Sequence, residues 1–227
     1  MLAELTVKEL AAYFDHTQLK AYAQKEDFEK LCREADEYGF AMVAINSSPV
    51  ACCKELLKDS KVHVGAAISF PLGQTTIETK VFETKNAIAN GASEIDMVIN
   101  IGFLKDGRYE EVENEIRAIH EACDGRILKV IIETCLLTEE EKIKMCEIVT
   151  NAGAEFIKTS TGFSTAGATF ADVELMKKYI GKDVKVKAAG GISSFDDAEK
   201  FISLGAERLG TSSLIKILKN TDTGAGY

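Results

Sequence analysis

Charged side chains recur on β-rich segments of this sequence, where an alternating strand would place them on one face. Asp96 lies in EIDMVIN, Lys129 and Glu133 in ILKVIIET, Lys158 in EFIKTST and Lys187 in VKVKAA. Successive side chains of a strand point to opposite sides, so in each segment the charged residues oppose the aliphatic ones. Buried charges are costly unless they are paired or used in chemistry. These five side chains are therefore either a candidate site or a buried ion network.

Two of these residues are lysines on successive strand segments. A neutral lysine amine can attack a carbonyl to form a Schiff base, and the resulting iminium ion withdraws electrons from neighbouring bonds. An ordinary lysine has a pKa of about 10.4, which partial burial and a second nearby cation both lower. Lys158 and Lys187 could line one cavity, so the pair has the arrangement that amine catalysis requires.

Two glycine-containing segments indicate an anion site. KAAGG ends a strand segment at Gly191 and precedes Ile-Ser-Ser, and LGTSS ends the next strand segment at Ser213. Glycine permits a close backbone approach, and helix N-termini offer free N–H groups to a phosphate. Either cluster alone is as consistent with an ordinary tight turn. On consecutive terminal units they favour phosphate binding, which barrel enzymes often place there.

The elements that must position these residues alternate between strands and helices. Strands are expected at Phe40–Asn46, His63–Phe70, Glu94–Asn100, Ile127–Thr134, Glu155–Thr161, Val184–Ala189 and Arg208–Thr211, with an eighth at Tyr13–Leu19. Amphipathic helical stretches lie between them, such as Lys25–Tyr38, Thr75–Asn90, Tyr109–Ala122 and Thr138–Asn151. This pattern is typical of a parallel sheet covered by helices.

A weak internal repeat supports that interpretation. A glycine and a small residue precede a strand at Gly39, Gly91, Gly153 and Gly205, and glycine there would end the preceding helix in a left-handed conformation. Eight evenly spaced units predict an α/β fold, a compact (β/α)8 TIM barrel with an extra N-terminal helix. The alternative is an open doubly wound sheet, which the lack of a GxGxxG after the first strand disfavours in its dinucleotide-binding form.

Composition narrows the function classes further. The 227 residues carry 27 Lys and Arg against 36 Asp and Glu, a net charge of −9, which argues against nucleic acid or an acidic membrane as a partner. No apolar run approaches the ~20 residues of a membrane span, and the acidic N-terminus does not resemble a signal peptide. The six cysteines include no CxxC pair, so we expect reduced thiols in a cytoplasmic protein without a metal site. One domain is expected over residues 1–227.

At this point the motifs resemble a known family. IKTSTG around Lys158, KAAGG from Lys187, EID ending at Asp96 and LKVIIET are together similar to the deoxyribose-phosphate aldolase family, over nearly the whole chain from FDHT at residues 14–17. The resemblance implies a class I aldolase, a lyase that needs no metal or other cofactor. The family cleaves 2-deoxy-D-ribose 5-phosphate reversibly into D-glyceraldehyde 3-phosphate and acetaldehyde, in deoxyribonucleotide and carbohydrate catabolism.

The resemblance also implies roles for individual residues. Lys158 resembles the Schiff-base lysine, Lys187 the second lysine that perturbs it, and Asp96 the acid that moves protons through water. Tyr227, at the end of a flexible tail over residues 221–227, resembles a tyrosine that protonates the carbon that becomes the methyl of acetaldehyde. The substrate-binding positions implied are Asp15, Thr17, Lys129, Thr161, Gly162, Gly190, Gly191, Gly210, Ser212 and Ser213.

One departure from the family concerns the phosphate. Some members carry a lysine after STG, where this chain has Phe163, so less cationic help is expected from that loop. Another Schiff-base aldolase on the same fold, or a phosphate-sugar binding or isomerase barrel, remains an alternative function. Family membership also suggests a homodimer or a higher homo-oligomer.

Overall fold

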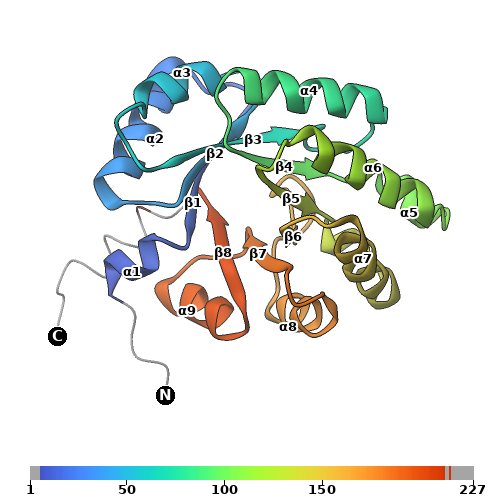
Figure 1. Cartoon of the computed structure of the whole chain (residues 1–227). Coiled ribbons are helices and arrows are strands. Elements are labelled where there is room, and N and C mark those ends of the chain that lie inside the picture. Colours follow the sequence, from blue (N-terminus) through green and yellow to red (C-terminus); the bar gives the residue numbers. More distant parts are fainter. Residues whose placement is uncertain (1–5, 213–214, 216–227) are drawn as a thin grey trace.

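The chain folds into a closed barrel of parallel strands (Figure 1). A computed structural model describes residues 6–212 and residue 215. Neighbouring strands pair in chain order, and the last pairs with the first, which confirms the (β/α)8 barrel and excludes the open sheet. The strands are β1 (Phe14–Gln18), β2 (Met42–Asn46), β3 (His63–Ile68), β4 (Glu94–Val98), β5 (Ile127–Ile131), β6 (Phe156–Lys158), β7 (Lys185–Ala189) and β8 (Ala206–Thr211).

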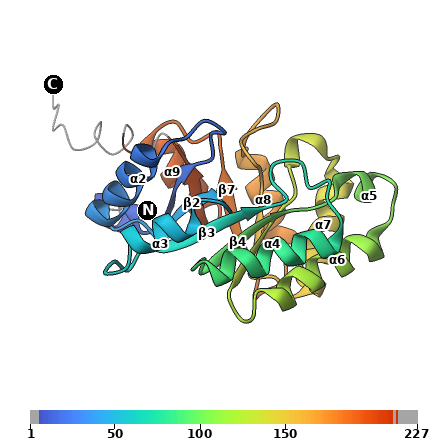
Figure 2. The same cartoon turned by 90° about the horizontal axis from the view of Figure 1, so that it is seen from above.

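Helices surround this barrel on the outside, as Figures 1 and 2 show from two directions. The helix expected before the first strand is α1 (Val7–Ala11), which begins with a capping box between Thr6 and Glu9. The helices that follow are α2 (Lys25–Tyr38), α3 (Val50–Leu56), α4 (Ile77–Ala89), α5 (Ile101–Lys105), α6 (Tyr109–Ala122), α7 (Glu139–Ala152), α8 (Phe170–Tyr179) and α9 (Phe195–Ser203), with a 3-10 turn at Thr134–Leu136. No helix among the described residues is long and apolar enough to span a membrane.

The glycine repeat has the backbone conformation expected from the sequence. Gly39, Gly91, Gly153 and Gly205 have φ values of 70°, 109°, 81° and 103°. Each follows a helix and precedes a strand. These are angles that side chains other than glycine adopt only with strain, so the repeat marks the same turn in four βα units.

Several strands are shorter than the sequence pattern predicts. β4 ends at Val98 because Asn100 instead caps α5, accepting a hydrogen bond from the N–H of Phe103 at 3.1 Å. β5 ends at Ile131, and Glu133 takes a left-handed φ of 54°. β6 ends at Lys158, three residues earlier than expected. Lys158 is thus the last residue of β6, and Asp96, Lys129 and Lys187 are the middle residues of β4, β5 and β7.

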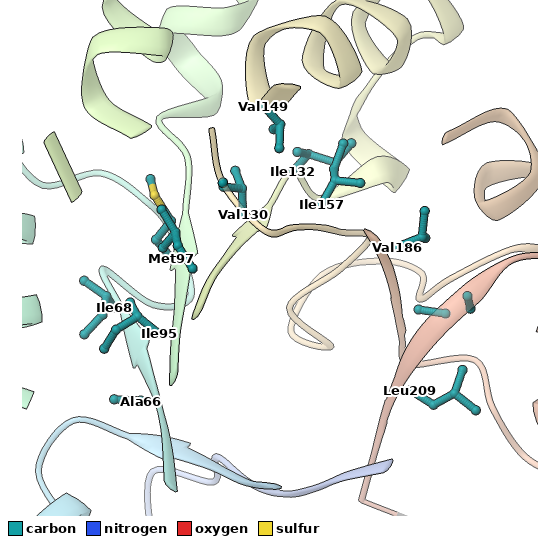
Figure 3. Packing of buried hydrophobic residues seen from close by; sticks show 14 of the residues in the cluster. Ala66, Ile68, Ile95, Met97, Val130, Ile132, Val149, Ile157, Val186 and Leu209 are labelled. Atoms are coloured by element: carbon teal, nitrogen blue, oxygen red, sulfur yellow. The ribbon is translucent and has the colours of Figure 1, made fainter. Parts of the chain in front are cut away.

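The hydrophobic core lies between the strands and the helices. Ile95 and Met97 of β4, Val130 of β5 and Ile157 of β6 are fully buried on the helix-facing side of the sheet (Figure 3). Val149, which comes from α7, packs against this layer. Because aliphatic residues occupy the outer face, the alternate residues of the same strands point into the barrel.

Candidate active site

Two lysines and one aspartate meet inside the barrel, as the alternation pattern predicts. Strand register places Lys158 of β6 beside Lys187 of β7, and Asp96 of β4 beside Lys129 of β5. Oδ2 of Asp96 lies 2.7 Å from Nζ of Lys158 and 2.6 Å from Nζ of Lys187. Oδ1 of Asp96 accepts from Nζ of Lys129 at 2.7 Å. One carboxylate therefore binds three amines, and all four side chains are buried.

The environment of Lys158 favours its neutral form. Burial lowers the pKa of Lys158 most, Asp96 opposes that effect, and the positive charge of Lys187 lowers the pKa further, to about 8. Burial disfavours the charge of Asp96 too, but Lys129, Lys158 and Lys187 hold its pKa well below its usual range. A nucleophilic amine beside a permanently ionised carboxylate is the combination that imine chemistry uses.

A second layer of ion pairs supports these residues from deeper in the barrel. Oε2 of Glu94 lies 2.5 Å from Nζ of Lys129, and Arg208 contacts both carboxylate oxygens of Glu94 at 3.0 and 3.1 Å. Asp15 lies 2.5 Å from both Arg208 and Lys187. Asp15 and Lys129, expected near the substrate, are thus members of this network below the cavity.

Sequence reasoning missed Glu94 and Arg208. Glu94 lies two residues before Asp96, and Arg208 two residues before Gly210, so alternation places each on the inward face. β8 begins at Ala206 rather than at Arg208, which makes Arg208 an interior strand position instead of a strand end. Applying the same two-residue spacing to the whole of both strands would have found the pair.

Apart from the half-exposed His63, which hydrogen-bonds Glu94 at the edge, the charges of this interior network balance only when Lys158 is neutral. Its three carboxylates are Asp15, Glu94 and Asp96, and its other cations are Lys129, Lys187 and Arg208. Burial lowers the pKa of Lys129, but Asp96 and Glu94 outweigh burial and raise it, so Lys129 remains charged. A protonated Lys158 would add a fourth cation to a buried site, which is unfavourable.

Glu133 differs from the other inward-facing charges. Its carboxylate is buried, but it accepts hydrogen bonds from the backbone N–H of Thr161 at 3.2 and 3.3 Å and from the Thr161 hydroxyl. The Thr161 hydroxyl in turn accepts from the N–H of Phe163 at 3.0 Å. Glu133 therefore fixes the loop after Lys158 rather than joining the lysine cluster.

A cavity of about 630 Å³ opens above Lys158 and Lys187 at the carboxyl ends of the strands. Most of the predicted substrate-binding residues line it, namely Thr17, Thr161, Gly162, Gly190, Gly191, Gly210 and Ser212. Ser213 and Tyr227, with the tail over residues 221–227, lie outside the described residues.

Unpaired backbone N–H groups gather on one wall of this cavity. Among the described residues, nothing accepts from the N–H groups of Gly162, Gly191 and Ile192. The N–H of Gly190 instead bonds to the carbonyl of Gly210 at 3.0 Å. Gly190 and Gly191 both have φ of 71°, and a Cβ on Gly191 would lie 2.7 Å from the carbonyl oxygen of Ala168, so only glycine fits. This wall can hold an anion.

Metal-binding clusters do not form in the described part of the chain. Within residues 6–212 no group of three or more His, Cys, Asp and Glu side chains is placed to hold an ion. The carboxylates of the interior are instead paired with lysine and arginine.

Comparisons with known proteins agree with this geometry. The family model of the DeoC/LacD family aldolases matches residues 10–219. Deoxyribose-phosphate aldolases of Clostridium perfringens and Clostridioides difficile are each 55% identical, over 97% and 96% of this chain and 99% of theirs. The solved structure of the deoxyribose phosphate aldolase from Aeropyrum pernix superposes with a TM-score of 0.90 at 31% identity, covering 96% of this chain and 93% of that one.

A (β/α)8 barrel with a buried lysine amine beneath a wall of free N–H groups is the architecture of a class I aldolase. The match along nearly the whole chain then defines the family: the chain belongs to the DeoC/LacD family of aldolases.

Proposed function

We propose that this aldolase cleaves 2-deoxy-D-ribose 5-phosphate reversibly into D-glyceraldehyde 3-phosphate and acetaldehyde through a Schiff base on Lys158. One observation carries the proposal: the buried amine of Lys158, whose pKa is lowered to about 8, shares a cavity with unpaired N–H groups. The relatives that are 55% identical are deoxyribose-phosphate aldolases, which supports this substrate.

The first step is attack of the neutral Lys158 amine on the aldehyde carbon C1 of the open-chain sugar. The carbinolamine that forms loses water and becomes a protonated imine. Oδ2 of Asp96 lies within 2.7 Å of the amines of both Lys158 and Lys187, so Asp96 and Lys187 can supply and remove the protons of this dehydration. Water carries the proton where the carboxylate does not reach the substrate oxygen.

Carbon–carbon cleavage follows from the imine. A base removes the proton of the C3 hydroxyl, the C2–C3 bond breaks, and its electron pair moves toward the iminium nitrogen to form an enamine. C3 leaves as the aldehyde of D-glyceraldehyde 3-phosphate. We assign the base to Asp96 acting through water, because it is ionised and lies beside the nitrogen of Lys158.

The enamine is then protonated at C2, and hydrolysis of the new imine releases acetaldehyde. We assign this protonation to Tyr227. The assignment rests on the resemblance to the family alone, because Tyr227 lies outside the described residues. The hydrolysis regenerates the neutral amine of Lys158, with Asp96 and Lys187 returning the protons that they exchanged in the first step.

The phosphate group is held on the wall of unpaired N–H groups. Gly162, Gly191 and Ile192 supply backbone donors, and Ser212 of the loop after β8 adds a side-chain hydroxyl. Ser213 is proposed to add another. Because Lys158 lies on the floor of the same cavity, this anchor sets the distance between the phosphate and the reacting C1.

The proposal is tested by following 2-deoxy-D-ribose 5-phosphate with the purified protein by NMR. Acetaldehyde and D-glyceraldehyde 3-phosphate should appear in equal amounts, and the reverse reaction should consume both. A ketose phosphate as the product would favour the isomerase alternative. Cleavage of another sugar phosphate, with release of a different carbonyl donor, would favour another aldolase. Binding of the sugar phosphate without turnover would favour a non-catalytic barrel.

We also propose that the chain assembles as a homodimer or a higher homo-oligomer. The relative from Aeropyrum pernix is described as tetrameric. Leu72 and Phe82 of this chain are 71% and 72% exposed, a cost that burial against a second copy would remove. Light scattering of the purified protein should give a multiple of 24.7 kDa, and a mass of one chain would contradict the proposal.

A further inference from the structure

Three lysines line the cavity among the described residues, and two of them are committed to carboxylates. Lys158 and Lys187 both contact Asp96. The third is Lys20, and no carboxylate among the described residues lies within ion-pair distance of its amine. The next lysine along the chain, Lys25, is paired with Glu29 at 3.4 Å. Lys20 is therefore the lining lysine without a carboxylate partner among the described residues; its amine lies 5.7 Å from the centre of the exposed Tyr22 ring.

The backbone around Lys20 is fixed although its side chain is exposed. The N–H of Lys20 donates to Oε1 of Gln18 at 3.3 Å, and its carbonyl accepts from the N–H of Ala23 at 3.1 Å. The carbonyl of Leu19 accepts from the Asn46 side chain at 3.4 Å. These bonds hold the backbone of the loop after β1 at the rim of the cavity. When an anion binds, only the side chain of Lys20 must therefore lose conformational freedom.

Closure of the barrel brings this loop beside the anion wall. β1 pairs with β8 in a register that sets Asp15 against Gly210 and His16 against Thr211. The chain after β1 therefore runs alongside the chain after β8, which carries Ser212. Lys20 thus lies on the same side of the cavity as the proposed phosphate position.

The loop after β6, which adds the N–H of Gly162 to the anion wall, contributes no charge. Phe163 follows Gly162 in that loop, lines the cavity, and packs edge-on against Phe70 with ring centroids 5.4 Å apart. A phosphate carries a charge of about −1.5 to −2 at neutral pH, which the neutral N–H groups of the wall do not balance.

We propose that Lys20 is the specificity residue for the phosphate group, closing the anion site from the β1 side with its ammonium. This inference rests on the proposed function and adds to it the residue that distinguishes a phosphorylated from an unphosphorylated sugar. Hydrogen bonds to charged groups exceed neutral ones in strength, and about 1.4 kcal/mol corresponds to a tenfold change in affinity.

The test compares Lys20→Gln with Lys25→Gln as the matched control. Lys20→Gln should raise KM for 2-deoxy-D-ribose 5-phosphate about tenfold with little change in kcat, because the lost contact is the same in ground and transition states. Its kcat/KM for unphosphorylated 2-deoxy-D-ribose should equal that of the unmutated protein. Lys20→Arg should restore most of the affinity, and Lys25→Gln should change neither value.

A binding measurement separates this inference from the proposed function. Inorganic phosphate titrated into the protein should bind about tenfold more weakly to Lys20→Gln than to Lys25→Gln. That result without sugar cleavage would keep the role of Lys20 and reject the aldolase substrate. Cleavage with unchanged phosphate affinity in Lys20→Gln, or an equal loss on both sugars, would overturn the role of Lys20.

Discussion

Lys158 and Lys187 donate to the same oxygen of one carboxylate, Oδ2 of Asp96, at 2.7 and 2.6 Å. Two amines that share one acceptor cannot both keep a full positive charge at low cost inside a barrel. Lys187 is further held by Asp15 at 2.5 Å, whereas Lys158 contacts only Asp96 among the described carboxylates. The geometry thus assigns the charge to Lys187 and leaves Lys158 as the nucleophile.

Replacement of Lys187 should move the pH dependence of the reaction. Lys187→Leu removes a positive charge that lowers the pKa of Lys158, so that pKa should rise above about 8. Because only the neutral amine attacks, the rise of kcat/KM with pH should shift to higher pH, with residual activity at its plateau. Activity–pH profiles of both proteins measure this, and coincident profiles would contradict the electrostatic role.

Replacement of Asp96 should separate imine formation from proton transfer. Asp96→Asn leaves Lys129, Lys158 and Lys187 without their shared anion, so the pKa of Lys158 should fall and its amine should remain nucleophilic. Turnover should drop by roughly 10²–10⁴-fold, which is the rate factor that general acid–base catalysis typically contributes. Single-turnover rates compared with the rate of borohydride trapping measure the two steps, and an equal loss in both would reject the proton-transfer role.

Asp96→Asn should also destabilise the fold. Breaking a buried ion pair from one side costs roughly 3–5 kcal/mol, because the remaining charges stay buried without a partner. Urea unfolding gives this free energy and shows whether the variant is folded in the kinetic assays. A loss well below this range would mean that the three amines find other partners or lose their protons.

Much of this site follows from two-residue alternation in the sequence. Asp96, Lys158 and Lys187 each oppose aliphatic neighbours on their strands, and the structure brings all three together. Glu133 obeys the same pattern in ILKVIIET, but the chain leaves the strand at Ile131 and turns the carboxylate toward Thr161. Alternation predicts a face only while the strand lasts, and single-sequence patterns locate strand ends poorly.

Contacts between residues that lie far apart in the sequence could not be predicted from the alternation pattern. Arg208 and Asp15 are 193 positions apart along the chain and meet only because β8 closes on β1. The N–H groups of Gly191 and Ile192, which have no acceptor among the described residues, could not be distinguished in sequence from that of Gly190, which bonds to Gly210. Such contacts depend on barrel closure and loop geometry rather than on local propensity.

Two histidines should give opposite pH dependences of stability. The hydrogen bond that the His63 ring donates to the Glu94 carboxylate raises the pKa of His63. The stabilising effect of this contact is therefore full below the unfolded pKa of about 6.5 and is lost as pH rises through the folded pKa. Burial is the main cause that lowers the pKa of His16, so His16 costs stability as pH falls through its unfolded pKa.

Urea unfolding of His63→Gln and His16→Gln across about pH 5–9 tests these signs. The stability lost in His63→Gln, relative to the unmutated protein, should shrink as pH rises. The loss in His16→Gln should instead shrink as pH falls. Parallel curves for the two variants would show that neither histidine is perturbed in the stated direction.

Replacement of Tyr227 tests the assignment made from the family resemblance. Tyr227→Phe removes the phenolic proton, so incorporation of solvent deuterium into the methyl group of acetaldehyde should slow and turnover should fall. Imine formation at Lys158 should proceed as before. Deuterium exchange followed by NMR measures the step, and equal rates in the two proteins would remove Tyr227 from the mechanism.

The central claim is that Lys158 forms the covalent imine, and borohydride trapping with acetaldehyde tests it most directly. Mass spectrometry of the digested protein should find one added ethyl group on the peptide that carries Lys158. Lys158→Arg, which replaces the nucleophilic amine with a guanidinium, should lose both the adduct and several orders of magnitude in activity. An ethyl group on Lys187, on another lysine, or on none would contradict the account.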